Sequence, residues 1–225
     1  MKIEYLLFNL CVLAGPLLMS FEKKIYFFSR WRPAMAAILL VAPGFILWDA
    51  AVTGRHWWFN PSYTLDFRIA GLPLEEWLFF FTVPFAALFV WEVIGFYLPD
   101  RRHAAAKGFA LLLWLAPLPG VLALCHGREY TGLMLLAVSL TAVLDRLLQT
   151  RLLSRQRVLL YFAATLMLNV ICNGYLTARP VVVYNAAHHL GLRVGTIPIE
   201  DFGYGFALIM PVTILYEKFR GTAPA

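Results

Sequence analysis

Charged side chains are scarce in this chain. Asp, Glu, Lys and Arg make up only 14% of its 225 residues, whereas hydrophobic residues make up 61%. In a soluble globular domain about a quarter of the residues are charged, so the composition excludes an ordinary water-soluble fold. It indicates an integral membrane protein.

Residues that commonly bind metals are also few. The three cysteines, Cys11, Cys125 and Cys172, lie far apart without a C-x-x-C pair, and we interpret them as small packing residues. The histidines are expected at helix ends or in loops, and none lies at a metal-ligand spacing from another. They are His56, His103, His126, His188 and His189. The sequence therefore predicts no metal site.

Long apolar runs are abundant. A helix needs about 20 apolar residues to cross roughly 30 Å of hydrocarbon. Such runs lie near 4–20, 34–52, 76–98, 108–125, 131–148, 157–176 and 201–217. We therefore predict an all-α fold with seven transmembrane helices. No small-residue cleavage site follows the first run, so we expect it to remain as a helix rather than to act as a signal peptide.

The basic residues are unevenly distributed between the two sides of these helices. Most of the 19 Lys and Arg residues, among them Lys23, Arg101, Arg151 and Lys218, fall on one side. Because short cytoplasmic loops collect Lys and Arg, we predict a multi-pass protein of the cell membrane with its N-terminus outside and its C-terminus in the cytoplasm. This bias and the anionic inner leaflet account for the net charge of +6, so no nucleic-acid partner is expected.

The sequence repeats itself at an offset of 125 residues. The stretch FNPSYTLDFRIAGLPLEEW at 59–77 aligns without a gap with YNAAHHLGLRVGTIPIEDF at 184–202. At this offset the first three predicted helices match the last three, and the fourth has no counterpart. An unpaired helix restores the orientation of the second copy, so we predict two parallel three-helix repeats in a 3+1+3 arrangement. The predicted boundaries are 1–98, a linking helix at 99–127, 128–220, and a tail at 221–225.

Two adjacent acids begin the third helix of each repeat. They are Glu75 and Glu76 in LPLEEWLFFF, and Glu200 and Asp201 in IPIEDFGYGF. One such pair after a proline could be an ordinary acid-rich helix start. Two such pairs in apolar surroundings favour an acid and a base that transfer protons. Parallel repeats usually have their site between the two halves. These four acids are therefore the candidate catalytic residues of a shared pocket.

Other candidate binding residues are aromatic or polar and surround the acids. The aromatic rings are typical of an interfacial belt, but rings that face inward would stabilise a cation. The amides could cap backbone or orient the acids. The candidates are Trp48, Asp49, Asn60, Trp77, Phe80, Asn173, Tyr184, Asn185, Phe202 and Tyr204.

The motifs PLEEWLFF and PIEDFGYGF, each after an Asn-containing loop in a 3+1+3 chain, resemble the membrane lycopene cyclase family. Its split members are heterodimers of three-helix subunits, and an extra helix joins the halves in its fused members. The resemblance covers essentially the whole chain, with Asp201 in place of the second Glu of the P-x-E-[ED] motif. It implies a fused lycopene β-cyclase, an isomerase of carotenoid biosynthesis that needs no cofactor. The implied partners are lycopene, membrane lipid and other enzymes of the pathway.

The chemistry of ring closure suits these residues. It adds a proton to a terminal double bond, joins two carbons and removes another proton, so an acid, a base and a dry pocket suffice. Longer C50 substrates and ε- or γ-rings stay open within the family. A small 3+1+3 transporter is the alternative of another class, but a matched proline in the first helix of each repeat is missing, since Pro16 aligns with Thr141.

Overall fold

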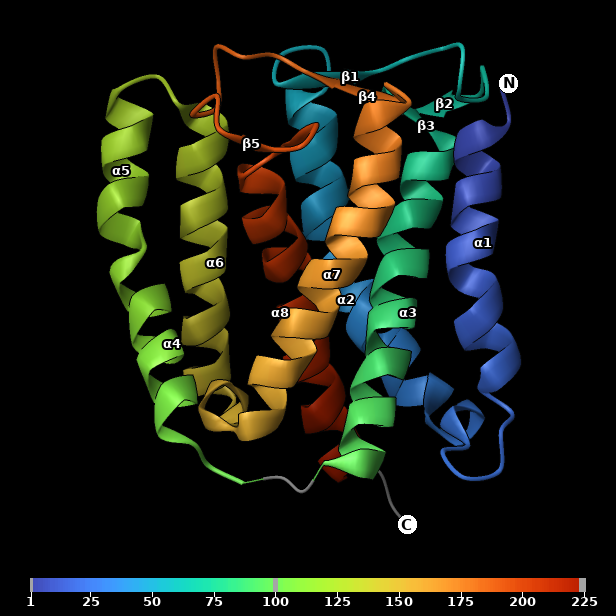
Figure 1. Cartoon of the computed structure of the whole chain (residues 1–225), viewed down its shortest axis with the longest axis vertical. Helices are drawn as coiled ribbons and strands as arrows, with labels where there is room; N and C mark the ends of the chain where they lie inside the picture. The colour runs from blue at the N-terminus through green and yellow to red at the C-terminus, as the bar shows by residue number, and fades with distance from the viewer. Residues whose placement is uncertain (1, 99–100, 223–225) are drawn as a thin grey trace.

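This computed structural model describes residues 2–98 and 101–222 (Figure 1). The described residues form eight α-helices, two short 3-10 helices (Phe27–Arg30 and Leu152–Ser154) and six very short strands. The helices are α1 (Glu4–Met19), α2 (Trp31–Val52), α3 (Leu74–Tyr97), α4 (Ala104–Leu115), α5 (Pro117–Cys125), α6 (Glu129–Leu147), α7 (Gln156–Ala178) and α8 (Glu200–Thr222). The strands are β1 (Trp57–Phe59), β2 (Arg68–Ile69), β3 (Leu72–Pro73), β4 (Val182–Tyr184), β5 (Arg193–Val194) and β6 (Ile197–Pro198). The predicted all-α class is confirmed.

Several helices are suited to a lipid bilayer. Five segments are long and apolar enough to cross it, namely Phe27–Val52, Leu74–Tyr97, Ala104–Cys125, Glu129–Leu147 and Gln156–Ala178. α1 is apolar but has only 16 residues, and α8 carries charged residues near both ends. These segments fit a multi-pass membrane protein, and the count of seven crossings stays a prediction.

The single linking helix that the sequence predicts is divided into two helices in the structure. α4 ends at Leu115 and α5 begins at Pro117, whose ring cannot continue the hydrogen bonds of the preceding turn. Both pack on α6 at the edge of the bundle (Figure 1). A Cβ on Gly132 of α6 would lie 2.8 Å from the carbonyl oxygen of Gly120, so glycine permits this close approach. Residues 99–100 of the predicted link and 223–225 of the predicted tail lie outside the described residues.

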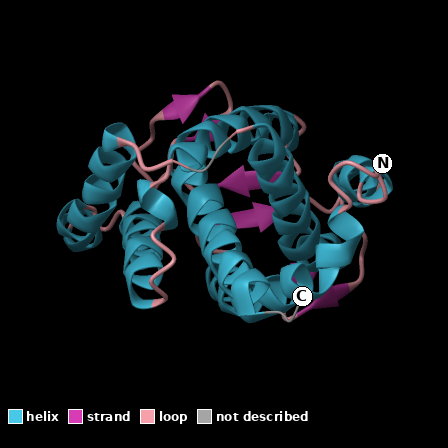
Figure 2. Cartoon of the chain, turned by 90° about the horizontal axis from the view of Figure 1, so that it is seen from below, coloured by secondary structure: helices cyan, strands magenta, loops and turns pink. Residues whose placement is uncertain are grey.

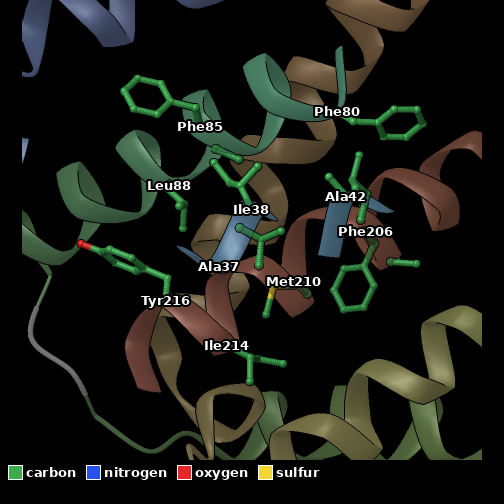
Figure 3. Packing of buried hydrophobic residues seen from close by; sticks show 14 of the residues in the cluster. Ala37, Ile38, Ala42, Phe80, Phe85, Leu88, Phe206, Met210, Ile214 and Tyr216 are labelled. Carbon is green, nitrogen blue, oxygen red and sulfur yellow. The ribbon is translucent and has the colours of Figure 1, made fainter. Parts of the chain in front are cut away.

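The two repeats pack across each other. α2 contacts α8 of the second repeat as well as its own α3, and α7 contacts α3 as well as its own α8. In Figure 3, Ala37 and Ile38 of α2 lie between Leu88 of α3 and Met210 of α8, and all four side chains are buried. Small residues such as Ala37 let helices approach closely. Each repeat therefore completes the interior of the other.

The six strands gather at one end of the bundle, which we call the strand end (Figure 1). The hairpins β2–β3 and β5–β6 occupy matched positions before the two acidic helices, with Arg68 opposite Pro73 and Arg193 opposite Pro198. β1 of the first repeat pairs with β4 of the second. Seen from below, short strands are visible inside the ring of helices (Figure 2). The sequence did not predict these strands, because two or three residues show no detectable alternation.

The repeats exchange hydrogen bonds at the opposite end. Trp91 Nε1 donates to Glu217 Oε1 at 2.8 Å, and Tyr216 OH donates to Glu92 Oε1 at 2.8 Å. Trp91 and Tyr216 match at the 125-residue offset, as do Glu92 and Glu217. The same pair of positions thus joins the repeats twice, once in each direction.

Candidate active site

A largely apolar cavity of about 410 Å³ lies between the repeats. Its walls come from α1, α2, α3, α6, α7 and α8, with β1 and β4 at the strand end. The lining of α1 runs from Tyr5 to Met19, which spans roughly 20 Å at 1.5 Å per residue. Met19 also lines the cavity and is 53% exposed, so the cavity reaches the lipid-facing surface. This shape suits an extended hydrocarbon.

Glu76, in the first turn of α3, faces this cavity from the first repeat. Tyr5 OH donates to its Oε2 at 2.5 Å. The carboxyl group of Asp49 of α2 lines the cavity beside that of Glu76, near enough for the two groups to share a hydrogen bond. Two carboxyl groups can share a hydrogen bond only if one of them carries a proton. The first repeat therefore provides a buried pair of acids that is built to hold a proton.

Two donors hold Asp49 in place through one oxygen of its carboxyl group, Oδ1. Trp57 Nε1 donates to Oδ1 at 2.7 Å and Thr53 Oγ1 donates to it at 3.1 Å. Oδ2 is buried and meets no N–H or O–H donor among the described residues. A proton shared with Glu76 would give Asp49 Oδ2 the hydrogen bond that it lacks.

Asp201, in the first turn of α8, faces the cavity from the second repeat. Its Oδ1 accepts from Tyr130 OH at 2.6 Å, and its Oδ2 accepts from Tyr184 OH at 2.7 Å and from Asn173 Nδ2 at 2.7 Å. Burial and the charge of Asp201 raise the pKa of the Tyr184 hydroxyl well above its usual range, so this hydroxyl stays protonated and donates. Three donors on one carboxyl group favour its ionised form.

Tyr5 and Tyr130 match at the 125-residue offset, and each donates to the second acid of its own repeat. The sequence analysis missed both residues, although the same alignment that paired the acids also pairs these tyrosines. Trp57 is not among the predicted binding residues either, yet it lines the cavity and donates to Asp49.

Glu75 and Glu200 point away from the cavity. Glu75 Oε1 accepts from the backbone N–H of Leu65 at 2.7 Å, and Glu200 Oε1 accepts from that of Leu190 at 2.8 Å. Thr131 Oγ1 also donates to Glu200 Oε1 at 2.6 Å. Both glutamates are fully buried. The four predicted acids thus form two kinds, a cavity pair and a pair that anchors the loop before each acidic helix.

The other predicted binding residues divide in the same way. Asp49, Asn173, Tyr184 and Tyr204 line the cavity. Six others do not line it, namely Trp48, Asn60, Trp77, Phe80, Asn185 and Phe202.

Local hydrogen bonds hold three of these six residues outside the cavity lining. Asn60 Oδ1 accepts from the N–H of Ser62 at 3.0 Å, and Asn185 Nδ2 donates to the Arg55 carbonyl at 2.9 Å, so both amides shape loops. Trp77 Nε1 donates to the carbonyl of Ile69 at 3.1 Å.

Two of the three cysteines contradict the interpretation as packing residues. Cys11 and Cys125 are exposed on the surface of the bundle, where lipid would cover them. Cys172 is half-buried and lines the cavity. Apolar helices present small residues to lipid as readily as to a core, so composition alone could not distinguish the two positions.

Comparison with protein families finds the lycopene cyclase family twice in the chain, at residues 3–94 and at residues 128–219. The two segments confirm the internal repeat, and α4 and α5 lie between them. Comparison with curated proteins and with solved structures finds no match.

Proposed function

Because the chain belongs to the lycopene cyclase family, which implies a carotenoid cyclase with a lipophilic substrate, we propose that it is a fused lycopene β-cyclase with one active site. One observation carries this proposal: Glu76 of the first repeat and Asp201 of the second line the same cavity. The proposal includes seven crossings in a 3+1+3 arrangement, with repeats at 1–98 and 128–220. No cofactor is required, because the product is an isomer of the substrate.

The first step is protonation of the terminal double bond of the ψ-end. We assign this proton to the Glu76–Asp49 pair, because the two carboxyl groups are neighbours and both line the cavity. The resulting cation is attacked by the neighbouring double bond, which forms the carbon–carbon bond of the ring and moves the charge to the methyl-bearing ring carbon. A dry site protects both cations from water.

The second step removes a proton from the ring. We assign the base to Asp201, because the three donors around its carboxyl group stabilise the ionised form that accepts a proton. Loss of the proton from the ring carbon that bears the polyene chain gives the β-ring. The proton must then return from Asp201 to Glu76 before the next turnover, so the enzyme is unchanged.

Aromatic rings between the two acids suit the cationic intermediates. Trp57 lies 5.0 Å from Tyr130 and 6.2 Å from Tyr204 between ring centroids, and all three residues line the cavity. The negative faces of such rings stabilise a nearby cation. They do so without offering a nucleophile as reactive as water.

Pigment analysis tests the proposal. A host that makes lycopene and expresses this chain should accumulate γ-carotene and then β-carotene. Only lycopene, with the protein demonstrably in the membrane, would count against a cyclase. Rings of ε- or γ-type would keep the cyclase and change the position of the base.

The orientation is a separate proposal, based on the distribution of Lys and Arg. It places the strand end and both cavity acids toward the outer face of the cell membrane. A reporter that works only in the cytoplasm, fused after Ala225, should be active. Activity of a reporter that works only outside, at the same point, would reverse the topology.

A further inference from the structure

Three side chains that the proposed reaction does not use converge at the strand end. They are His56 in the loop after α2, Glu129 at the start of α6, and His188 in the loop after β4. Their ligand atoms all lie within 4.8 Å of one another. His56 Nε2 lies 2.9 Å from Glu129 Oε2, and the two imidazole rings are 4.6 Å apart between centroids. None of the three lines the cavity.

We propose that His56, Glu129 and His188 form a binding site for a divalent transition-metal cation, with Zn²⁺ as the best-suited ion. Two imidazoles and one carboxylate are a common protein ligand set for Zn²⁺. A tetrahedral ion with ligands at about 2.0–2.2 Å holds them about 3.4 Å apart, so shifts of about 1 Å close the present arrangement. The sequence rule for histidine spacing missed the site, because its ligands come from three distant segments.

An unpartnered nitrogen of His188 supports this assignment. Nδ1 of His188 is buried and has no hydrogen-bond partner among the described residues. Buried polar atoms without a partner are rare and call for an explanation such as a bound ion or water.

The internal repeat offers a natural control for this site. Glu4 matches Glu129 at the 125-residue offset and begins α1 as Glu129 begins α6. Glu4 is bound by Arg179 at 2.8 and 3.1 Å and by Tyr175 at 2.7 Å. An arginine fork and a phenol therefore bind this carboxylate where Glu129 meets a histidine.

Arg55 is a cation that already contacts one residue of the proposed site. Its Nη1 lies 2.8 Å from Glu129 Oε2, but its side chain is 53% exposed. A metal ion at Glu129 would displace this guanidinium into solvent at little cost, since exposed ion pairs are weak. The Glu129 side chain is itself 35% exposed, so the ion has a path of entry and room for a water ligand.

A metal ion here would join the two repeats. His56 belongs to the first repeat, and Glu129 and His188 belong to the second. The residue after His56 is Trp57, which holds Asp49. The ion would therefore hold together the cover of the cavity at the strand end, which is a structural role distinct from the chemistry.

Metal content of the purified protein tests this inference. The full chain, without a histidine tag, is extracted in detergent, treated with a chelator and equilibrated with Zn²⁺. We expect one Zn²⁺ per chain by elemental analysis, and Co²⁺ in its place should give visible absorption typical of a low-symmetry site. Zn²⁺ should also raise the melting temperature, since it binds only the folded protein.

The decisive variants are His188→Gln and Glu129→Gln, whose side chains are not fully buried. Each should weaken Zn²⁺ binding at least tenfold while the melting temperature without metal stays close to that of the wild type. His126→Gln, at an exposed histidine of the same end, and Glu4→Gln, at the matched acid, should bind as the wild type does.

Two results would overturn the inference. One is a wild-type protein that retains no Zn²⁺ at micromolar free metal. The other is undiminished binding by His188→Gln and Glu129→Gln. Neither result bears on the cyclase proposal, because pigment analysis is a separate measurement that needs no purified protein.

Discussion

Glu76 and Asp201 occupy the same place in the two repeats and have different surroundings. Each lies in the first turn of its helix, lines the cavity and accepts from a matched tyrosine. Beyond the tyrosine, Glu76 meets another carboxyl group, that of Asp49. Asp201 instead meets the amide of Asn173 and the hydroxyl of Tyr184.

This comparison shows how a duplicated scaffold can perform chemistry that is not symmetric. Ring closure needs a group that gives a proton and a group that takes one, so two identical sites would be in the wrong state half of the time. The duplicated scaffold gives Glu76 and Asp201 the same position. The residue that the second helix of each repeat places beside the acid differs. In the proposed mechanism, the carboxyl group beside Glu76 helps it to retain a proton, whereas the amide beside Asp201 stabilises a charge.

Removal of either cavity acid should have the largest effect. Glu76→Gln and Asp201→Asn preserve shape but cannot exchange a proton, so each should slow β-carotene formation at least 100-fold, about 2.7 kcal/mol or more. The rate is measured in membranes per amount of inserted protein. Near-normal rates in either variant would remove that residue from the chemistry.

Asp49→Asn tests the comparison by changing the neighbour of Glu76 and not the acid itself. It gives Glu76 the kind of neighbour that Asp201 has, and Trp57 can still donate to the amide oxygen. We expect about a tenfold loss of rate, ~1.4 kcal/mol, because Glu76 loses the group that shares its proton. Asn173→Asp should also slow the reaction, since a proton shared with Asp201 would neutralise the base. If both variants keep the wild-type rate, the neighbours do not divide the roles.

The two matched tyrosines offer a finer test. Tyr130→Phe removes one of three donors from Asp201, whereas Tyr5→Phe removes the phenol donor of Glu76. Each deletes one hydrogen bond to an acid, so a loss of about fivefold, ~1 kcal/mol, is expected. Because Tyr130 acts on the base, its loss should also change the ratio of ring types, which chromatography resolves. A change of ring type in Tyr5→Phe alone would exchange the assigned roles.

Much of this architecture was predictable from the sequence. Apolar runs located most of the spanning helices, and the offset of 125 residues identified both acidic motifs and their common end. The offset works because a duplicated fold keeps polar residues where the same backbone needs them. Tyr5 and Tyr130 lay in that alignment and were overlooked.

The choice within each pair of acids was not predictable. Adjacent residues of a helix point about 100° apart, and at this depth both directions are buried, since Glu75 and Glu76 are 0% and 7% exposed. Only the packing of the preceding hairpin decides which of them faces the cavity. Three-dimensional clusters such as His56 with Glu129 are hidden for the same reason, because sequence spacing reports only neighbours along the chain.

The smallest effect is expected at the anchoring acids, Glu75 and Glu200. Each of them is compared with the adjacent cavity acid of its own repeat. In Glu75→Gln and Glu200→Gln the amide oxygen can still accept from the N–H of Leu65 or Leu190, so the loop should keep its place. We expect rates within about threefold of the wild type, well under 1 kcal/mol. Glu75→Ala should instead lower the free energy of unfolding by about 1 kcal/mol, because the half-buried N–H of Leu65 loses its acceptor. Rates and melting temperatures of the three variants separate these outcomes. If Glu75→Gln slowed the reaction as much as Glu76→Gln, with an unchanged melting temperature, the proton would have to pass through Glu75, and the division between cavity acids and anchoring acids would be wrong.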